Sequence, residues 1–203
     1  MRKILLAITL IMVLACSASA LPRLAVRQFE DRSEEGKAPA GAVMDMMVTE
    51  LNKAGVFDLI EREHLDYIAD EIKLGQMGLI DPSTAIEVGK IQSPRYTMTG
   101  AITLYYYSEK GSGFALPILG SATQAKTAYV MLDIRIIDNA TSKIIYTSDQ
   151  LGQSKQVAKG ALATYKGFFI GSYNRTTGGL LATATRDSVM KHVAAIKAIN
   201  WKE

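Results

Sequence analysis

The chain alternates apolar and polar side chains in two long runs, and this period of two constrains its fold more than any other feature. The apolar positions are Tyr96, Met98, Gly100, Ile102 and Leu104 in the first run, and Ala128, Val130, Leu132, Ile134 and Ile136 in the second. Successive side chains of a strand point to opposite faces of its sheet, so each run predicts a long strand with one buried face. The turn-forming residues 138–142 predict a third strand over 143–151, which makes 128–151 a hairpin.

Other segments space their apolar residues as helices do. These segments are residues 43–54, 61–74 and 180–199. Asp81 and Pro82 predict a further helix that ends near Ile91, because aspartate caps free N–H groups and proline loses no hydrogen bond at the first helical position. Short strands are predicted at 21–29 and 56–60. We therefore expect an α/β or α+β fold in which helices flank a mixed β-sheet.

The start of the chain has the three zones of an export signal. Its first three residues are basic, residues 4–15 are almost wholly apolar, and small residues follow up to Ala20. The apolar zone is shorter than the roughly 20 residues that a membrane-spanning helix needs. We expect residues 1–20 to be a signal peptide and residues 21–203 to form one domain of an exported protein.

Two processing routes fit this signal. Ala18 and Ala20 suit ordinary signal peptidase, which needs small side chains at both positions. Leu14-Ala15-Cys16 is similar to a bacterial lipobox, although Leu14 is bulkier than usual there. If that route is used, Cys16 becomes the acylated N-terminus. Cleavage after Ala20 and lipidation at Cys16 both stay open.

Composition argues against several kinds of chemistry. The formal charge of +3 falls to +1 without residues 1–20, so the mature chain lacks the basic excess that nucleic-acid binding requires. The only cysteine is Cys16, which leaves no thiol nucleophile and no disulfide. The two histidines, His64 and His192, do not stand at a metal-ligand spacing, and we expect both at the surface or its boundary. We predict no cofactor, no metal and no enzymatic activity.

An acidic cluster is the one remaining candidate for catalysis. Glu30, Asp31, Glu34 and Glu35 could supply a pair of carboxylates for acid–base work or a cation site. Such a pair needs one carboxylate in an apolar pocket that raises its pKa, and this loop is polar throughout. A solvated loop is the better interpretation.

Two long stretches fit an ordinary domain poorly. Residues 105–126 and 152–179 are rich in Gly, Ala, Ser and aromatic residues, and structureless loops of this length are uncommon in compact domains. Transmembrane β-strands tolerate such a composition and carry aromatic residues at both membrane interfaces. The candidate aromatic residues are Tyr105, Tyr107, Phe114, Tyr165, Phe168, Phe169 and Tyr173. The stretches are therefore either membrane-inserting hairpins or ordinary exposed hairpins, and Lys159 interrupts the alternation in the second.

Four sequence segments together resemble the CsgG/HfaB family, the curli production assembly and transport lipoproteins of bacterial outer membranes. They are LAVRQFED at 24–31, GVFDLIERxxLxxIxxE at 55–71, AIEVGKIQSPRYTMTGAI at 85–102 and VMLDIRIIDNATSKII at 130–145. The resemblance covers nearly the whole mature chain. It rests on the order and spacing of the segments, because none of them is diagnostic alone.

The resemblance implies a ring of identical subunits, each of which sends two β-hairpins into the outer membrane to build a shared barrel. The partners that it implies are the same chain, the outer membrane, a secreted polypeptide cargo and accessory periplasmic proteins. The loop that narrows the family's channel corresponds here to a short segment without aromatic residues. Its candidate channel-loop residues are Arg32, Glu34, Glu35 and Lys37.

The leading hypothesis is thus a subunit of an oligomeric outer-membrane channel for the secretion of extracellular polypeptide. A second hypothesis is a soluble periplasmic interaction module, similar to the TolB N-terminal domain or to the lipoprotein activators of cell-wall synthases. The short loop after the first strand and the interruption at Lys159 favour this second hypothesis.

Overall fold

The computed structural model describes residues 20–34, 36–115, 120–162 and 177–201, with the backbone alone for 111–115, 120–124, 158–162 and 177. The strands are β1 (Arg23–Val26), β2 (Glu30–Asp31), β3 (Asp58–Leu59), β4 (Tyr96–Ala115), β5 (Gly120–Asp138) and β6 (Lys143–Leu162). The helices are α2 (Ala40–Ala54), α3 (Leu65–Gln76) and α4 (Thr177–Lys197). The predicted strands at 21–29 and 56–60 are therefore present but shorter than expected.

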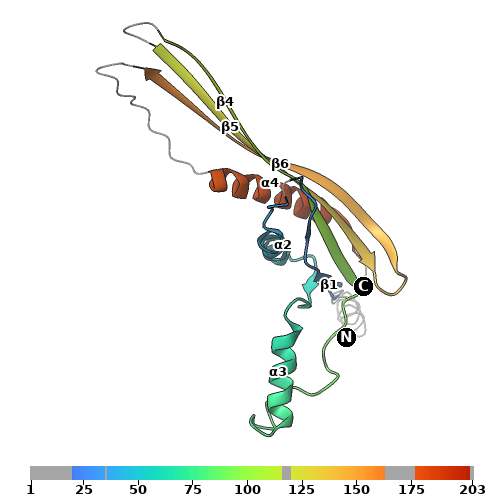
Figure 1. The fold of residues 1–203 in the computed structure, drawn as a ribbon. Coiled ribbons are helices and arrows are strands. Elements are labelled where there is room, and N and C mark those ends of the chain that lie inside the picture. The colour runs from blue at the N-terminus through green and yellow to red at the C-terminus, as the bar shows by residue number, and fades with distance from the viewer. Residues whose placement is uncertain (1–19, 35, 116–119, 163–176, 202–203) are drawn as a thin grey trace, which may run out of the picture.

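The strands form one mixed sheet with the order β3-β1-β4-β5-β6, and β2 also pairs with β4. β1 pairs in parallel with β3 and β4, whereas β4, β5 and β6 are antiparallel to one another. The described helices α2 and α4 lie on the same side of this sheet (Figure 1). The predicted fold class, a mixed sheet flanked by helices, is confirmed.

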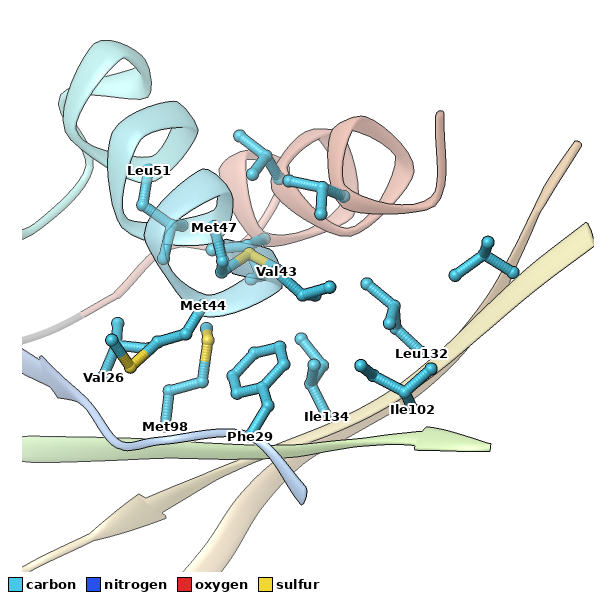
Figure 2. Packing of buried hydrophobic residues seen from close by; sticks show 14 of the residues in the cluster. Val26, Phe29, Val43, Met44, Met47, Leu51, Met98, Ile102, Leu132 and Ile134 are labelled. Carbon is cyan, nitrogen blue, oxygen red and sulfur yellow. The ribbon is translucent and has the colours of Figure 1, made fainter. Parts of the chain in front are cut away.

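The apolar side of the sheet and the two helices enclose the core (Figure 2). Val130, Leu132 and Ile136 are fully buried on β5, as their alternation predicted. Met47 and Leu51 of α2 meet them at helical spacing and are fully buried too. Removing these side chains from water supplies most of the folding free energy, at roughly 1.5–3 kcal/mol each.

Helix α4 packs directly against the backbone of β6. A Cβ atom on Gly152 would overlap the carbonyl oxygen of Ala184 and lie 2.6 Å from the Ser188 nitrogen. Side chains of α4 also bond backbone groups of β6. Ser188 Oγ donates to Gln150 O (2.7 Å), Lys191 Nζ donates to Leu151 O (2.7 Å), and Gln153 N donates to Asp187 Oδ2 (3.0 Å). These bonds fix the helix on the strand.

The helix predicted from Asp81 to Ile91 is wrong. The Asp81 carboxylate does accept hydrogen bonds from the Ser83 N–H and hydroxyl, but only turns follow it. Most helical stability in proteins comes from packing an apolar face, and residues 61–93 contribute no buried side chain to the domain. The chain also reverses at Gly89, where φ is +83°.

The prediction that His192 lies at the surface or its boundary is also wrong, whereas His64 is exposed at the start of α3. His192 is fully buried between α4 and β5, where its Nε2 donates to Leu132 O (3.0 Å). Its Nδ1 is buried without a hydrogen-bond partner in the described part of the chain. Burial lowers the pKa of His192, although the Leu132 carbonyl, Asp133 and Asp149 oppose the shift.

Replacing Gly152 by Ala is expected to lower the free energy of unfolding by at least about 3 kcal/mol, because the new methyl group would force α4 away from β6. Gly178→Ala is the matched control, since nothing lies within 4 Å of its Cβ position. That control is expected to change stability by less than about 1 kcal/mol. Urea unfolding monitored by the fluorescence of Trp201 measures both variants, and equal effects would contradict the proposed close packing.

The buried His192 is expected to make the protein less stable as the pH falls from about 7 to about 5. The unfolded chain takes up a proton near its ordinary pKa of about 6.5, which the folded chain, with its lowered pKa, does not. The loss is at most about 1.4 kcal/mol per pH unit. Carboxylates with a lowered pKa, such as Asp187, which accepts a hydrogen bond from Lys191, lose their stabilising effect mainly below about pH 5, at the lower edge of this window. Urea unfolding of His192→Gln across this window is expected to show a flat profile, and an unchanged slope would contradict the assignment.

Candidate functional site

One side of the long strands is covered by neither α2 nor α4, and we call it the open face. Its side chains are those that alternate with the core positions. From the base of the sheet outward they include Thr99, Asp133, Arg135, Thr147, Asp149, Tyr106, Tyr129, Gln153, Lys110, Lys155 and Val157. A β-bulge between Ile102 and Leu104 shifts the register of β4 by one residue. Because of this bulge, Tyr106 lies on the open face and Tyr105 and Tyr107 pack against the core.

A polar groove of about 830 Å³ lies at the base of the open face. Residues of β4, β5 and β6 form its floor, and the segment that follows β1 forms a wall. The charged residues that line it are Arg27, Glu30, Arg32, Asp133, Arg135 and Asp149. Mixed charges in a wide polar groove suit contact with a polar surface or an extended chain better than the enclosure of a small apolar ligand.

Two of the charges on the groove floor are of the same sign and directly opposed. Asp133 and Asp149 stand directly opposite each other on β5 and β6, and Arg135 stands opposite Thr147. Like charges at opposed positions destabilise an antiparallel pair. An arrangement that costs stability in this chain is expected to serve contact with something outside it.

Asp31 organises the short loop beside the groove. Its carboxylate accepts hydrogen bonds from the Ser33 hydroxyl (2.6 Å), the Ser33 N–H (3.0 Å) and the Ala38 N–H (2.8 Å). The Ser33 hydroxyl and N–H, with the Ala38 N–H, hold the pKa of this carboxyl below its ordinary value. Sequence reasoning missed this role, although the spacing of Asp31 and Ser33 is typical of an Asx turn.

The predicted channel-loop residues do not all reach the groove. Arg32 lines it and forms an ion pair with Glu30 (2.6 Å). Glu34 and Lys37 are exposed and do not line it, and Glu35 lies outside the described residues. In this part of the chain, Arg32 binds Glu30 and the loop binds Asp31, so these two adjacent carboxylates are held by local partners.

The three long strands continue outward from the edge of the core as an extension that we call the arm, and its first rows, with Ala128 and Val130, are still buried. It consists of residues 105–115 of β4, 120–130 of β5 and 152–162 of β6, which remain paired throughout. Figure 1 shows the arm running past the first turn of α4. The arm begins at the level of Gly152, where α4 meets β6. The Tyr106 and Tyr129 rings stack across it on the open face, with centroids 6.5 Å apart.

The predicted aromatic candidates fall in different places. Tyr105 and Tyr107 lie at the start of the arm and pack against the core beside α4. Phe114 is the second-to-last residue of β4. Tyr165, Phe168, Phe169, Tyr173 and the candidate lipidation site Cys16 lie outside the described residues. Tyr129 was not among the candidates, because it belongs to the predicted half-buried strand and lies outside the two stretches rich in glycine and aromatic residues.

Two kinds of feature are absent from the described residues. No helix there is long and apolar enough to cross a membrane. No group of three or more His, Cys, Asp or Glu side chains is gathered there as metal ligands.

The sequence matches the family described as "Curli production assembly/transport component CsgG" over residues 9–203. The chain therefore belongs to the CsgG family. No curated protein matches the sequence.

Several solved structures are similar in fold at low sequence identity. Lipoprotein GNA1162 from Neisseria meningitidis is 13% identical, with 86% of this chain and 99% of that chain covered and a TM-score of 0.40. The hypothetical protein CT253 from Chlamydia trachomatis is 13% identical, with coverages of 88% and 97% and a TM-score of 0.44. A PelC dodecamer from Paraburkholderia phytofirmans is 14% identical, with coverages of 86% and 91% and a TM-score of 0.35.

Replacing Asp149 by Asn is expected to stabilise the protein, because it removes the repulsion from Asp133 across the groove floor. The expected gain is about 0.2–1 kcal/mol in the free energy of unfolding. Asp138→Asn is the matched control on β5, since Asp138 forms an ion pair with Arg95 (2.9 Å) and its replacement is expected to destabilise. Urea unfolding near neutral pH measures both, and a destabilised Asp149 variant would show that this aspartate has a structural role.

Proposed function

We propose that this chain is a non-enzymatic subunit of an oligomeric outer-membrane channel through which an extracellular polypeptide is secreted. The observation that carries the proposal is the length of the arm. β4, β5 and β6 contain 20, 19 and 20 residues, whereas an average strand has about 5–6. The fully buried apolar residues lie in the first half of β4 and from Ala128 onward in β5, so the remaining part of the long strands requires a different explanation.

The strands of the arm have the length that is needed to cross a membrane. From Tyr105 to Ala115, β4 continues for about ten residues, and a tilted transmembrane β-strand needs about 9–11. Tyr106 and Tyr129 stack on the open face at the start of this stretch. Aromatic residues at one level of a sheet are typical of a membrane–water interface.

The arm also calls for neighbouring subunits. Among the described strands, none pairs with the outer edge of β4 or of β6 within the arm. Unpaired backbone groups are not tolerated inside a bilayer, so an arm in a membrane must pair with other strands on both sides. In a closed ring of identical subunits, each arm pairs edge to edge with the arms of its two neighbours, so the backbone groups at both edges are hydrogen-bonded. The family membership of the chain supports this arrangement.

A second candidate function, a periplasmic interaction module, is favoured by the segment of residues 61–93. This segment includes α3, which stands away from the sheet in Figure 1. None of its side chains is buried, and Tyr67, Met77 and Val88 are each more than two-thirds exposed. An apolar surface of this kind commonly marks a contact with another protein.

The proposed function is tested with the full-length protein and with Ala125→Pro. Ala125 lies on the central strand of the arm and pairs with both Lys110 and Val157, so proline there removes a ladder hydrogen bond and disrupts the arm. Detergent-extracted parent protein is expected to give a ring by native mass measurement and to conduct ions in planar bilayers. The proline variant is expected to lose conductance while Trp201 fluorescence shows a folded domain.

Ala125→Ser is the matched control, because it keeps the backbone donor and should conduct as the parent does. A parent protein that fractionates as a periplasmic monomer without conductance would overturn the channel proposal. Resistance of residues 105–126 and 152–179 to proteinase added to intact cells, together with that result, would support the interaction module instead.

A further inference from the structure

The arm is basic in composition although the chain as a whole is close to neutral. The arm, residues 105–115, 120–130 and 152–162, contains four lysines, no arginine and a single carboxylate, Glu109. Three of these lysines have described side chains, and each stands on a different strand. They are Lys110 on β4, Lys126 on β5 and Lys155 on β6. They lie in three successive rows of the sheet, with Lys110 and Lys155 on the open face and Lys126 on the opposite face.

The lysines on the two faces of the arm differ in whether an ion-pair partner neutralises them. On the face that continues the core side of the sheet, Lys126 pairs with Glu109 (3.4 Å), and its side chain is only 17% exposed. The Tyr107 hydroxyl also donates to Glu109 (3.2 Å). The single carboxylate of the arm is thus used to neutralise the lysine on this face. A neutralised, hydrogen-bonded group is the form in which charge is tolerated next to an apolar medium.

On the open face the lysines are not neutralised. Lys110 and Lys155 are exposed, and neither side chain forms an ion pair or hydrogen bond with another described residue. Their neighbours across the strands are Ala125 and Thr127, and Ser108 stands opposite Thr127 on β4. Uncompensated lysines among small and hydroxyl-bearing residues require water. The open face of the arm is therefore the one suited to a water-filled passage.

We infer that, in the assembled channel, the open face of the arm lines the passage and its lysines favour an acidic polypeptide as cargo. This inference rests on the proposed function and adds the class of substrate to it. Lys110 and Lys155 would recur once in every subunit, so a ring would place two belts of positive charge around the lumen. Rings of like charge select permeating ions and chains of the opposite sign.

The groove at the base of the open face is continuous with this surface and lies on the domain side of it. Arg27 and Arg135 line the groove and have no ion-pair partner among the described residues. A chain that follows the open face from the domain to the arm would meet these arginines first, then the stacked Tyr106 and Tyr129 rings, and then the lysines. The path offers cationic and aromatic groups to an extended acidic segment.

The test measures ion selectivity in planar bilayers under a KCl gradient. The parent channel is expected to prefer chloride, and the double variant Lys110→Glu with Lys155→Glu is expected to reverse the sign of the reversal potential. The effect should grow at low salt, because physiological salt screens charges beyond about 8 Å. Lys197→Glu is the matched control, since this exposed lysine lies at the end of α4 outside the open face. The channel formed by this variant should have the same ion selectivity as the parent channel.

Cargo preference is tested in the same bilayers with model peptides. Poly-glutamate is expected to block the current of the parent channel more strongly than poly-lysine, and the double variant should show the opposite order. A conducting parent whose selectivity the double variant leaves unchanged would overturn this inference and leave the proposed function standing. A parent without conductance would overturn the proposed function, and the inference with it.

A second measurement remains informative if the double variant does not assemble. Val157 lies on the open face and the adjacent Gln156 on the opposite face, so Val157→Cys and Gln156→Cys form a matched pair. A charged thiol reagent added from the aqueous phase is expected to reduce the conductance of the Val157 variant alone. The unmodified parent controls for Cys16, and preferential reaction at position 156 would reverse the assignment of the two faces.

Discussion

The contact between α4 and the backbone of β6 at Gly152 is the constraint on which the rest of the structure depends. It holds the helix over the apolar side of the long strands, and the hydrogen bonds from Ser188 and Lys191 fix its position along them. The sheet must therefore leave the domain at this level with one side covered and the other bare. The different polarity of the two faces of the arm follows from this contact between α4 and β6.

The strands and helices with one buried face could be predicted from the sequence, because burial imposes a period on the apolar residues. The alternation from Ala128 to Ile136 and the end of α2 at Gly55, which adopts a left-handed φ of 64°, are examples. The burial of His192 could not be predicted, since a polar residue at a core position leaves no periodic signal. The turns at 81–91 were mistaken for a helix because a capping residue starts a helix only where packing can sustain it.

The candidate site was harder to predict than the fold, for a physical reason. Its features depend on residues from separate strands that register brings together, such as Asp133 with Asp149 and Tyr106 with Tyr129. Register depends on bulges and turns whose positions the sequence does not reveal. The continuity of β4, β5 and β6 into the arm was also hidden, because strands with two uncovered sides lose the alternation that marks a half-buried one.

The β-bulge in β4 has a further consequence. One extra residue near Thr103 decides which side chains of the outer strand turn toward the helices and which turn away. If the same residues ran through this site without the bulge, uninterrupted alternation would exchange the two sets, and Glu109 would replace Lys110 on the uncovered side. The electrostatic sign of that surface is thus specified by a local irregularity of the backbone as well as by the order of the charged residues.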